Sequence, residues 1–109
     1  MKKVLTILMT ALLFTGIGAA LAETFTGSLG TDWHSGSNWS GGRVPNLTGV
    51  NGANITNGRT ADVTRDTAFH GDFDMSNGTV NILNGARLSF HSNSWWGRPG
   101  TYSRINIID

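Results

Sequence analysis

The sequence predicts an all-β fold in which short strands stack in parallel, one above the next, as in the first coils of a β-solenoid. Three observations favour this fold: a repeated hexapeptide, short windows of alternating apolar and polar residues, and no helical period beyond residue 22. The hexapeptide occupies residues 53–58 and again residues 73–78, and each copy ends in Asn-Gly. A recurrence near twenty residues is typical of stacked repeats.

Residues 1–22 have the three parts of a secretory signal peptide. Lys2 and Lys3 come first, an apolar run follows, and the small residues Ala20 and Ala22 flank Leu21 at the cleavage site. No Cys follows Ala22, which excludes a lipoprotein anchor, and the rest of the chain has no apolar run long enough to span a bilayer. We therefore expect cleavage before Glu23, export, and no membrane span in the mature chain.

Composition limits the partners and the source of stability. Cleavage would remove both lysines and leave 8 − 2 = 6 Arg against 7 acidic residues over 109 − 22 = 87 residues. This near-neutral balance gives no electrostatic footprint for nucleic acid. The chain has no Cys, so disulfides cannot support the fold, and stability must come from burial in a modest core.

Residues 23–52 are expected to form a capping segment. Their Gly, Ser, Thr and Asn content predicts turns and short extended pieces rather than helix. Trp33 and Trp39 indicate that part of the segment packs. We expect these two indoles to plug the open end of the first coil, which keeps its strand edges from pairing with other chains.

The run from Asn38 to Pro45 reads Asn-Trp-Ser-Gly-Gly-Arg-Val-Pro and is preceded by Trp33. It resembles the opening segment of secreted bacterial β-solenoid repeat proteins, the autotransporter-passenger-like and surface-anchored kind. Residues 52–63 fall where that family has its first strand, turn and second strand, although Ala53 stands where an acidic residue is common. The resemblance implies a right-handed parallel β-helix. We therefore expect residues 53–109 to be the N-terminal portion of a right-handed parallel β-solenoid, truncated at its C-terminus.

Alternation beyond the capping segment predicts strands at residues 60–64, 78–83 and 103–108, and a shorter one at residues 88–90. The first three share inward pairs at offsets of 19 and 25 residues, which are Ala61 and Val63, Val80 and Ile82, and Ile105 and Ile107. The larger second offset is assigned to a loop at residues 92–101, because Gly97, Pro99 and Gly100 oppose regular structure there.

A small antiparallel β-meander or sandwich is the alternative fold. A hairpin closed at Asn77-Gly78 would place Met75 against Val80 on one apolar face. The same rule applied to Asn84-Gly85 places Ile82 against Arg87, which is a poor match. A meander also leaves the twenty-residue recurrence unexplained, so the solenoid is the preferred interpretation.

Three residues form a candidate metal site. His70, Asp72 and Asp74 stand at i, i+2 and i+4, which would place them on one face of a strand. Imidazole and carboxylate groups bind divalent ions, and oxygen ligands suit calcium. The other interpretation is a solvated outer face, as any amphipathic strand has. No cofactor is expected beyond calcium in the first interpretation.

Trp95 and Trp96 form a candidate sugar-stacking site. Two adjacent residues of one extended segment cannot both point inward, so at least one of these indoles is expected to be exposed. No G-x-S-x-G, H-E-x-x-H or P-loop pattern appears in the sequence. We therefore expect a protein that is not an enzyme and has no catalytic residues.

These observations predict an exported bacterial structural and adhesive module, secreted or held at the cell surface, that presents a rod of repeats to polysaccharide or cell-surface partners. Self-association through open coil ends is a further expectation. One alternative is a carbohydrate-binding or carbohydrate-active β-helix protein whose catalytic part is missing. Another is a divalent-ion-binding module.

Overall fold

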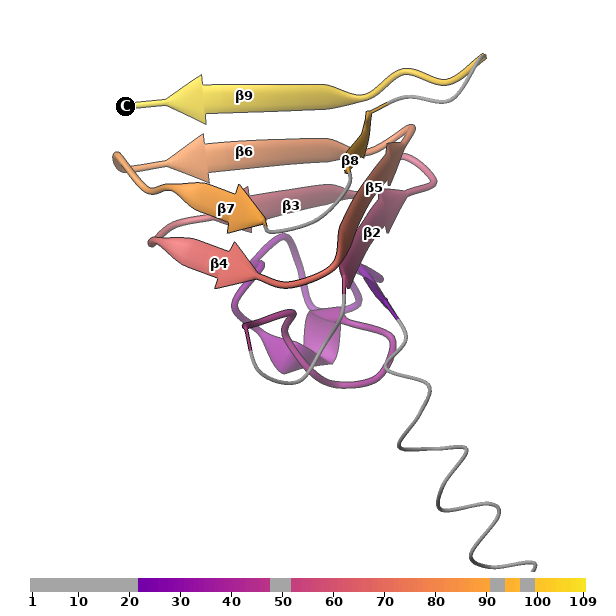
Figure 1. Cartoon of the computed structure of the whole chain (residues 1–109), viewed down its shortest axis with the longest axis horizontal. Helices are drawn as coiled ribbons and strands as arrows, with labels where there is room; N and C mark the ends of the chain where they lie inside the picture. Colours follow the sequence, from indigo (N-terminus) through magenta and orange to yellow (C-terminus); the bar gives the residue numbers. More distant parts are fainter. Residues whose placement is uncertain (1–21, 48–51, 91–93, 97–99) are drawn as a thin grey trace, which may run out of the picture.

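The computed structural model describes residues 22–47, 52–90, 94–96 and 100–109 (Figure 1). Strands and turns make up almost all of this part of the chain, and its single helical segment is a short 3-10 helix. The elements are, in order, β1 (Glu23–Thr24), η1 (Gly36–Asn38), β2 (Gly52–Thr56), β3 (Thr60–Val63), β4 (Thr67–Phe69), β5 (Asp72–Ser76), β6 (Thr79–Leu83), β7 (Leu88–Phe90), β8 (Ser94–Trp96) and β9 (Arg104–Ile108).

The strands form three sheets, and all of the strand pairs in them are parallel. Their orders are β1-β2-β5-β8, β3-β6-β9 and β4-β7. The chain passes from one sheet to the next and then returns to the first, so that β5, β6 and β7 lie on β2, β3 and β4 (Figure 1). The predicted all-β class with stacked parallel strands is confirmed at this level.

The antiparallel alternative is wrong for these strands. A hairpin at Asn77-Gly78 would pair β5 with β6, but β5 pairs with β2 and β8. Val80 lies opposite Ala61 and Ile105 instead of Met75. The reason is that the chain leaves β5 for a different sheet, so the Asn-Gly corner joins two sheets.

The predicted offsets match the strand register. Residue 53 pairs with residue 73, an offset of 20, within β2 and β5. Thr60 pairs with Thr79 and Thr79 with Arg104, which gives the predicted offsets of 19 and 25. The three strands predicted at residues 60–64, 78–83 and 103–108 correspond to β3, β6 and β9.

The loop predicted at residues 92–101 is interrupted by β8. Ser94 pairs with Phe73, so the neighbouring edge of β5 provides hydrogen bonds that the flanking Gly and Pro residues do not prevent. From Phe73 to Val80 is 7 residues, whereas from their partners Ser94 to Ile105 is 11. The additional residues of the third coil therefore lie between β8 and β9.

The two copies of the hexapeptide turn differently. Asn57 and Gly58 both have positive φ, 56° and 73°, whereas in the second copy only Asn77, at 59°, does. The second corner has two residues between its strands and the first has three, which explains why the offset falls from 20 to 19. Gly78 is buried against the carbonyl of Ile55, where a Cβ atom would overlap the backbone.

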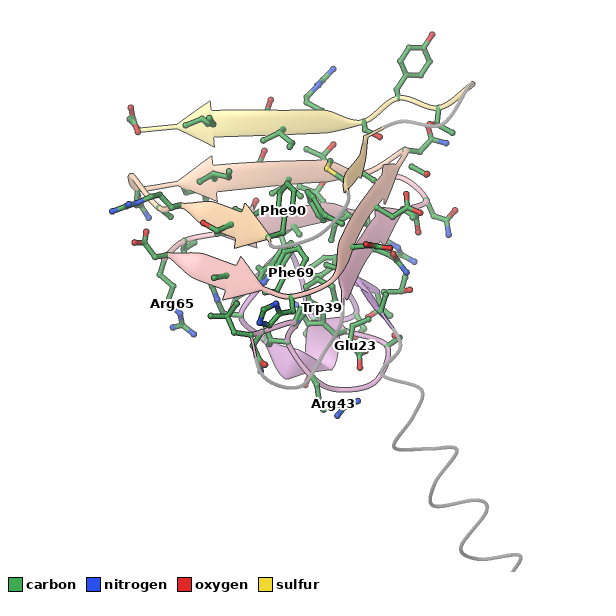
Figure 2. All side chains as sticks on the ribbon, in the orientation of Figure 1. Glu23, Trp39, Arg43, Arg65, Phe69 and Phe90 are labelled. Atoms are coloured by element: carbon green, nitrogen blue, oxygen red, sulfur yellow. The ribbon has the colours of Figure 1, made fainter. Side chains whose placement is uncertain are left out.

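Inward side chains of all three sheets form one apolar core. Its fully buried members are Phe25, Trp33, Trp39, Ala53, Ile55, Ala61, Val63, Phe69, Phe73, Met75 and Val80. Aromatic rings run through it, with centroid distances of 4.8 Å between Trp33 and Trp39 and 5.2 Å between Phe73 and Phe90 (Figure 2). The predicted packing of Trp33 and Trp39 is confirmed. The inward position predicted for Ile107 is not, because its side chain is 75% exposed.

Candidate functional site

Polar residues of the capping segment have structural roles. Asn38 is 1% exposed, accepts a hydrogen bond on Oδ1 from the Leu29 N–H at 2.7 Å, and donates from Nδ2 to the Asp32 carbonyl at 3.0 Å. Trp39 Nε1 donates to the Trp33 carbonyl at 2.7 Å. These contacts close the turns of the segment, so the Asn-Trp pair of the motif is explained by folding alone.

A buried carboxylate joins the first strand to the rest of this motif. Glu23 is 4% exposed, and its Oε2 accepts hydrogen bonds from the Gly41 N–H at 2.5 Å and from Ser40 Oγ at 3.1 Å. Arg43 Nε lies 3.8 Å from Oε1 (Figure 2). A Cβ atom on Gly41 would overlap the carboxylate. Sequence reasoning missed this contact, although an acidic residue beside a Ser-Gly-Gly-Arg run was a usable signal.

The candidate metal ligands do not share one strand face. Asp72 and Asp74 alternate on β5 as predicted, but His70 precedes that strand, and Gly71, with φ of 88°, turns the chain between them. Within the described ranges no group of three or more His, Asp or Glu side chains is placed to hold a metal ion. The proposed calcium site stays a prediction without a described ligand set.

The register brings two of the predicted sites onto neighbouring strands. Trp95 on β8 pairs with Asp74 on β5, and Trp96 pairs with Met75. The side chains of Trp95 and Trp96 lie outside the described residues. Asp74 in turn pairs with Asn54 on β2, and its Oδ1 accepts a hydrogen bond from Ser76 Oγ at 3.1 Å. Adjacent strands are about 4.8 Å apart, so these positions form one row across the sheet.

This row, which we name the polar row, consists of Thr24, Asn54 and Asp74 and leads to the register position of Trp95. Asn54 Nδ2 lies 3.4 Å from Thr24 Oγ1 as a donor. All three side chains are partly exposed, unlike the alternating residues of the same strands that fill the core. Hydroxyl, amide and carboxylate groups can exchange hydrogen bonds with the hydroxyls of a sugar.

An open pocket of about 280 Å³ lies over β4 and β7, and sequence reasoning did not predict it. Its lining residues are Asp66, Thr67, Ala68, Arg87 and Ser89. Asp66 accepts a 2.9 Å hydrogen bond from the Arg87 N–H, and the two charged groups lie 3.7 Å apart. Both side chains are largely exposed, so this pocket lacks the desolvation that tunes a catalytic acid or base.

His34 in the capping segment has a perturbed titration. Burial lowers the pKa of His34, the charge of Arg65 lowers it further, and Asp32 acts in the opposite direction. Its Nε2 is buried without a hydrogen-bond partner among the described residues. The neutral imidazole is therefore the form that this fold favours.

The described residues contain no helix with the length and hydropathy needed to cross a membrane. Comparisons of the chain with protein-family models, with curated proteins and with solved structures gave no match.

Proposed function

We propose that this chain is an exported bacterial structural and adhesive module, built as the N-terminal portion of a right-handed parallel β-solenoid. The observation that carries the proposal is the register of three parallel sheets, in which strands one repeat apart pair at offsets of 19 to 21 residues over the first two coils. Each coil covers the apolar side chains of the one before it. Such stacking produces a stiff rod whose outer side chains face a partner.

The proposed export agrees with the position of the first strand. β1 begins at Glu23, the residue that follows the predicted cleavage site. Because the Glu23 carboxylate is bound by Ser40 and Gly41, the fold uses the first residue of the proposed mature chain. A leader that ends at Ala22 would leave this contact intact.

The proposed non-catalytic role is supported by how the polar side chains are used. Asn81 Nδ2 donates to Asp62 Oδ1 at 2.7 Å, and Asn106 Nδ2 donates to Asn81 Oδ1 at 2.8 Å. This ladder crosses three coils on β3, β6 and β9. Its amides and carboxylate stabilise the stack through one another, which is a structural use of groups that could otherwise serve chemistry.

Expression of the full chain in a Gram-negative host tests the proposal. We expect intact-mass analysis of the exported protein to give an N-terminus at Glu23. We also expect the purified protein to cosediment with bacterial cells or with insoluble polysaccharide. Retention of the leader in a cytoplasmic product, or no binding to either material, would contradict the exported adhesive role.

Carbohydrate binding is a second candidate, favoured by the register pairing of Asp74 with Trp95. Aromatic rings stack on the apolar faces of sugars, and the polar row lies beside this position. Titration of Trp fluorescence with soluble plant and algal polysaccharides tests it. We expect W95A and D74A to weaken the response and R59A, at an exposed corner, to preserve it. An unchanged signal across the panel would remove this candidate.

A further inference from the structure

The two ends of the strand stack are finished differently. At one end the capping segment pairs with the first coil: the Phe25 N–H donates to the Asn54 carbonyl at 2.9 Å, and the Trp33 N–H donates to the Asp62 carbonyl at 3.0 Å. The indole of Trp33 is fully buried beneath this coil. The backbone edges of β2 and β3 are therefore already used at this closed end.

At the other end the outer edges are open. Among the described strands β9 has β6 as its only neighbour and β7 has β4 as its only neighbour, as Figure 1 shows for the yellow strand β9. Exposed apolar side chains gather here: Ile107 is 75% exposed, Ile108 50% and Tyr102 90%. A long edge strand with apolar side chains and free backbone groups is a template for pairing with another chain.

We propose that two copies of this chain associate open end to open end, with β9 pairing antiparallel to β9 of the second copy about a two-fold axis at Asn106. Head-to-tail stacking is disfavoured because the closed end has no free strand edge in β2 or β3. A two-fold arrangement uses the same surface on both copies and closes after two.

Charges and side-chain faces fit this arrangement. β9 begins with Arg104 and is followed by Asp109, so an antiparallel pair brings the positive start of each strand near the negative end of the other. A parallel pair would place like charges together. With the axis at Asn106, Ile105 of each copy lies opposite Ile107 of the other, which covers the exposed Ile107 side chain.

Asn106 itself can complete the contact. Its Nδ2 donates to Asn81, and among the described residues its Oδ1 accepts no hydrogen bond. A second Asn106 across the axis would supply a donor to that oxygen and accept one in return. The ladder of Asp62, Asn81 and Asn106 would then continue through the second copy.

Sedimentation velocity of the exported full-length product over a concentration series measures the association. We expect a dimer that I107K weakens at least about tenfold, whereas T64K, at an exposed position between β3 and β4, has no effect. R104D alone and D109R alone should each weaken the dimer, and the double variant R104D/D109R should restore it. Restoration by the charge swap is specific to antiparallel pairing.

Because the chain has no Cys, single thiols give a second measurement that does not depend on affinity. N106C should be joined to itself by a short bis-maleimide, and T64C should not. Circular dichroism of each variant establishes that it is folded. A monomer at every concentration, open-ended filaments, or a dimer indifferent to I107K would overturn the proposal, and none of these outcomes bears on export or polysaccharide binding.

Discussion

The Gly41 N–H donates a 2.5 Å hydrogen bond to the carboxylate of Glu23, eighteen residues earlier in the chain. This contact ties β1 to the Ser-Gly-Gly-Arg run of the capping segment. The carboxylate is nearly inaccessible to water, so its partners must replace the lost hydration. The motif that suggested a surface-protein family from sequence therefore has a mechanical role at the start of the fold.

Replacement of Glu23 by Ala should lower the free energy of unfolding by about 1–3 kcal/mol, because the buried Gly41 N–H loses a charged acceptor. Urea unfolding followed by Trp fluorescence measures this change. Asp66→Ala is the matched control, since its ion pair with Arg87 is exposed and should contribute no more than about 1 kcal/mol. Equal losses in the two variants would show that the Glu23 contact is not special.

Gly78→Ala should be more destabilising than Gly58→Ala, although both glycines end the same hexapeptide. A Cβ atom at residue 78 would overlap the carbonyl of Ile55, whereas at residue 58 it meets open space and only the positive φ is strained. We expect losses of about 3 kcal/mol or more at residue 78 and about 1 kcal/mol at residue 58. Midpoints of urea unfolding compare them, and a larger loss at residue 58 would contradict the packing assignment.

Much of this fold could be predicted because the repeat spacing and the period-two alternation both encode register. The pattern of Ala61, Val80 and Ile105 was enough to align β3, β6 and β9. β8 could not be predicted, since residues 94–96 are flanked by Gly and Pro and become a strand only against the edge of β5. The pairing of Asp74 with Trp95 depends on β8 and was missed for the same reason.

The candidate metal residues failed for a local reason. His70 and Asp72 are two residues apart, and the alternation rule holds only while the backbone stays extended. Gly71 adopts a positive φ between them, so His70 belongs to the corner between β4 and β5. Sequence alternation alone does not distinguish a glycine within a strand from a glycine that turns the chain.

The stability of the protein should fall as the pH drops below about 6.5, because burial and Arg65 lower the pKa of His34 in the folded state. The unfolded chain then binds a proton at a higher pH than the folded chain, so unfolding is favoured as protons become available. This loss begins near the ordinary pKa of 6.5 and levels off below the lowered folded value.

Urea midpoints at pH 7.5 and pH 5.5 measure the effect. The difference between them should shrink in His34→Gln and persist in His70→Gln, because the side chain of residue 70 is exposed. A pH difference that is the same in His34→Gln and the parent protein would show that other groups cause it.

Asn81→Asp should weaken the stack through the ladder that crosses the coils. Asn81 Nδ2 donates to Asp62 Oδ1 at 2.7 Å, and the substitution replaces this donor by a second carboxylate. We expect a loss of roughly 1–3 kcal/mol at pH 7. The loss should become smaller between pH 5 and pH 4, because a proton shared by the two carboxylates restores one hydrogen bond and removes the repulsion. Asn106→Ala is the control, since it removes only the last amide, at the open end of the stack, and should show no such recovery. Urea unfolding at each pH separates the two, and a pH-independent loss in Asn81→Asp would mean that the carboxylates of residues 62 and 81 do not face each other.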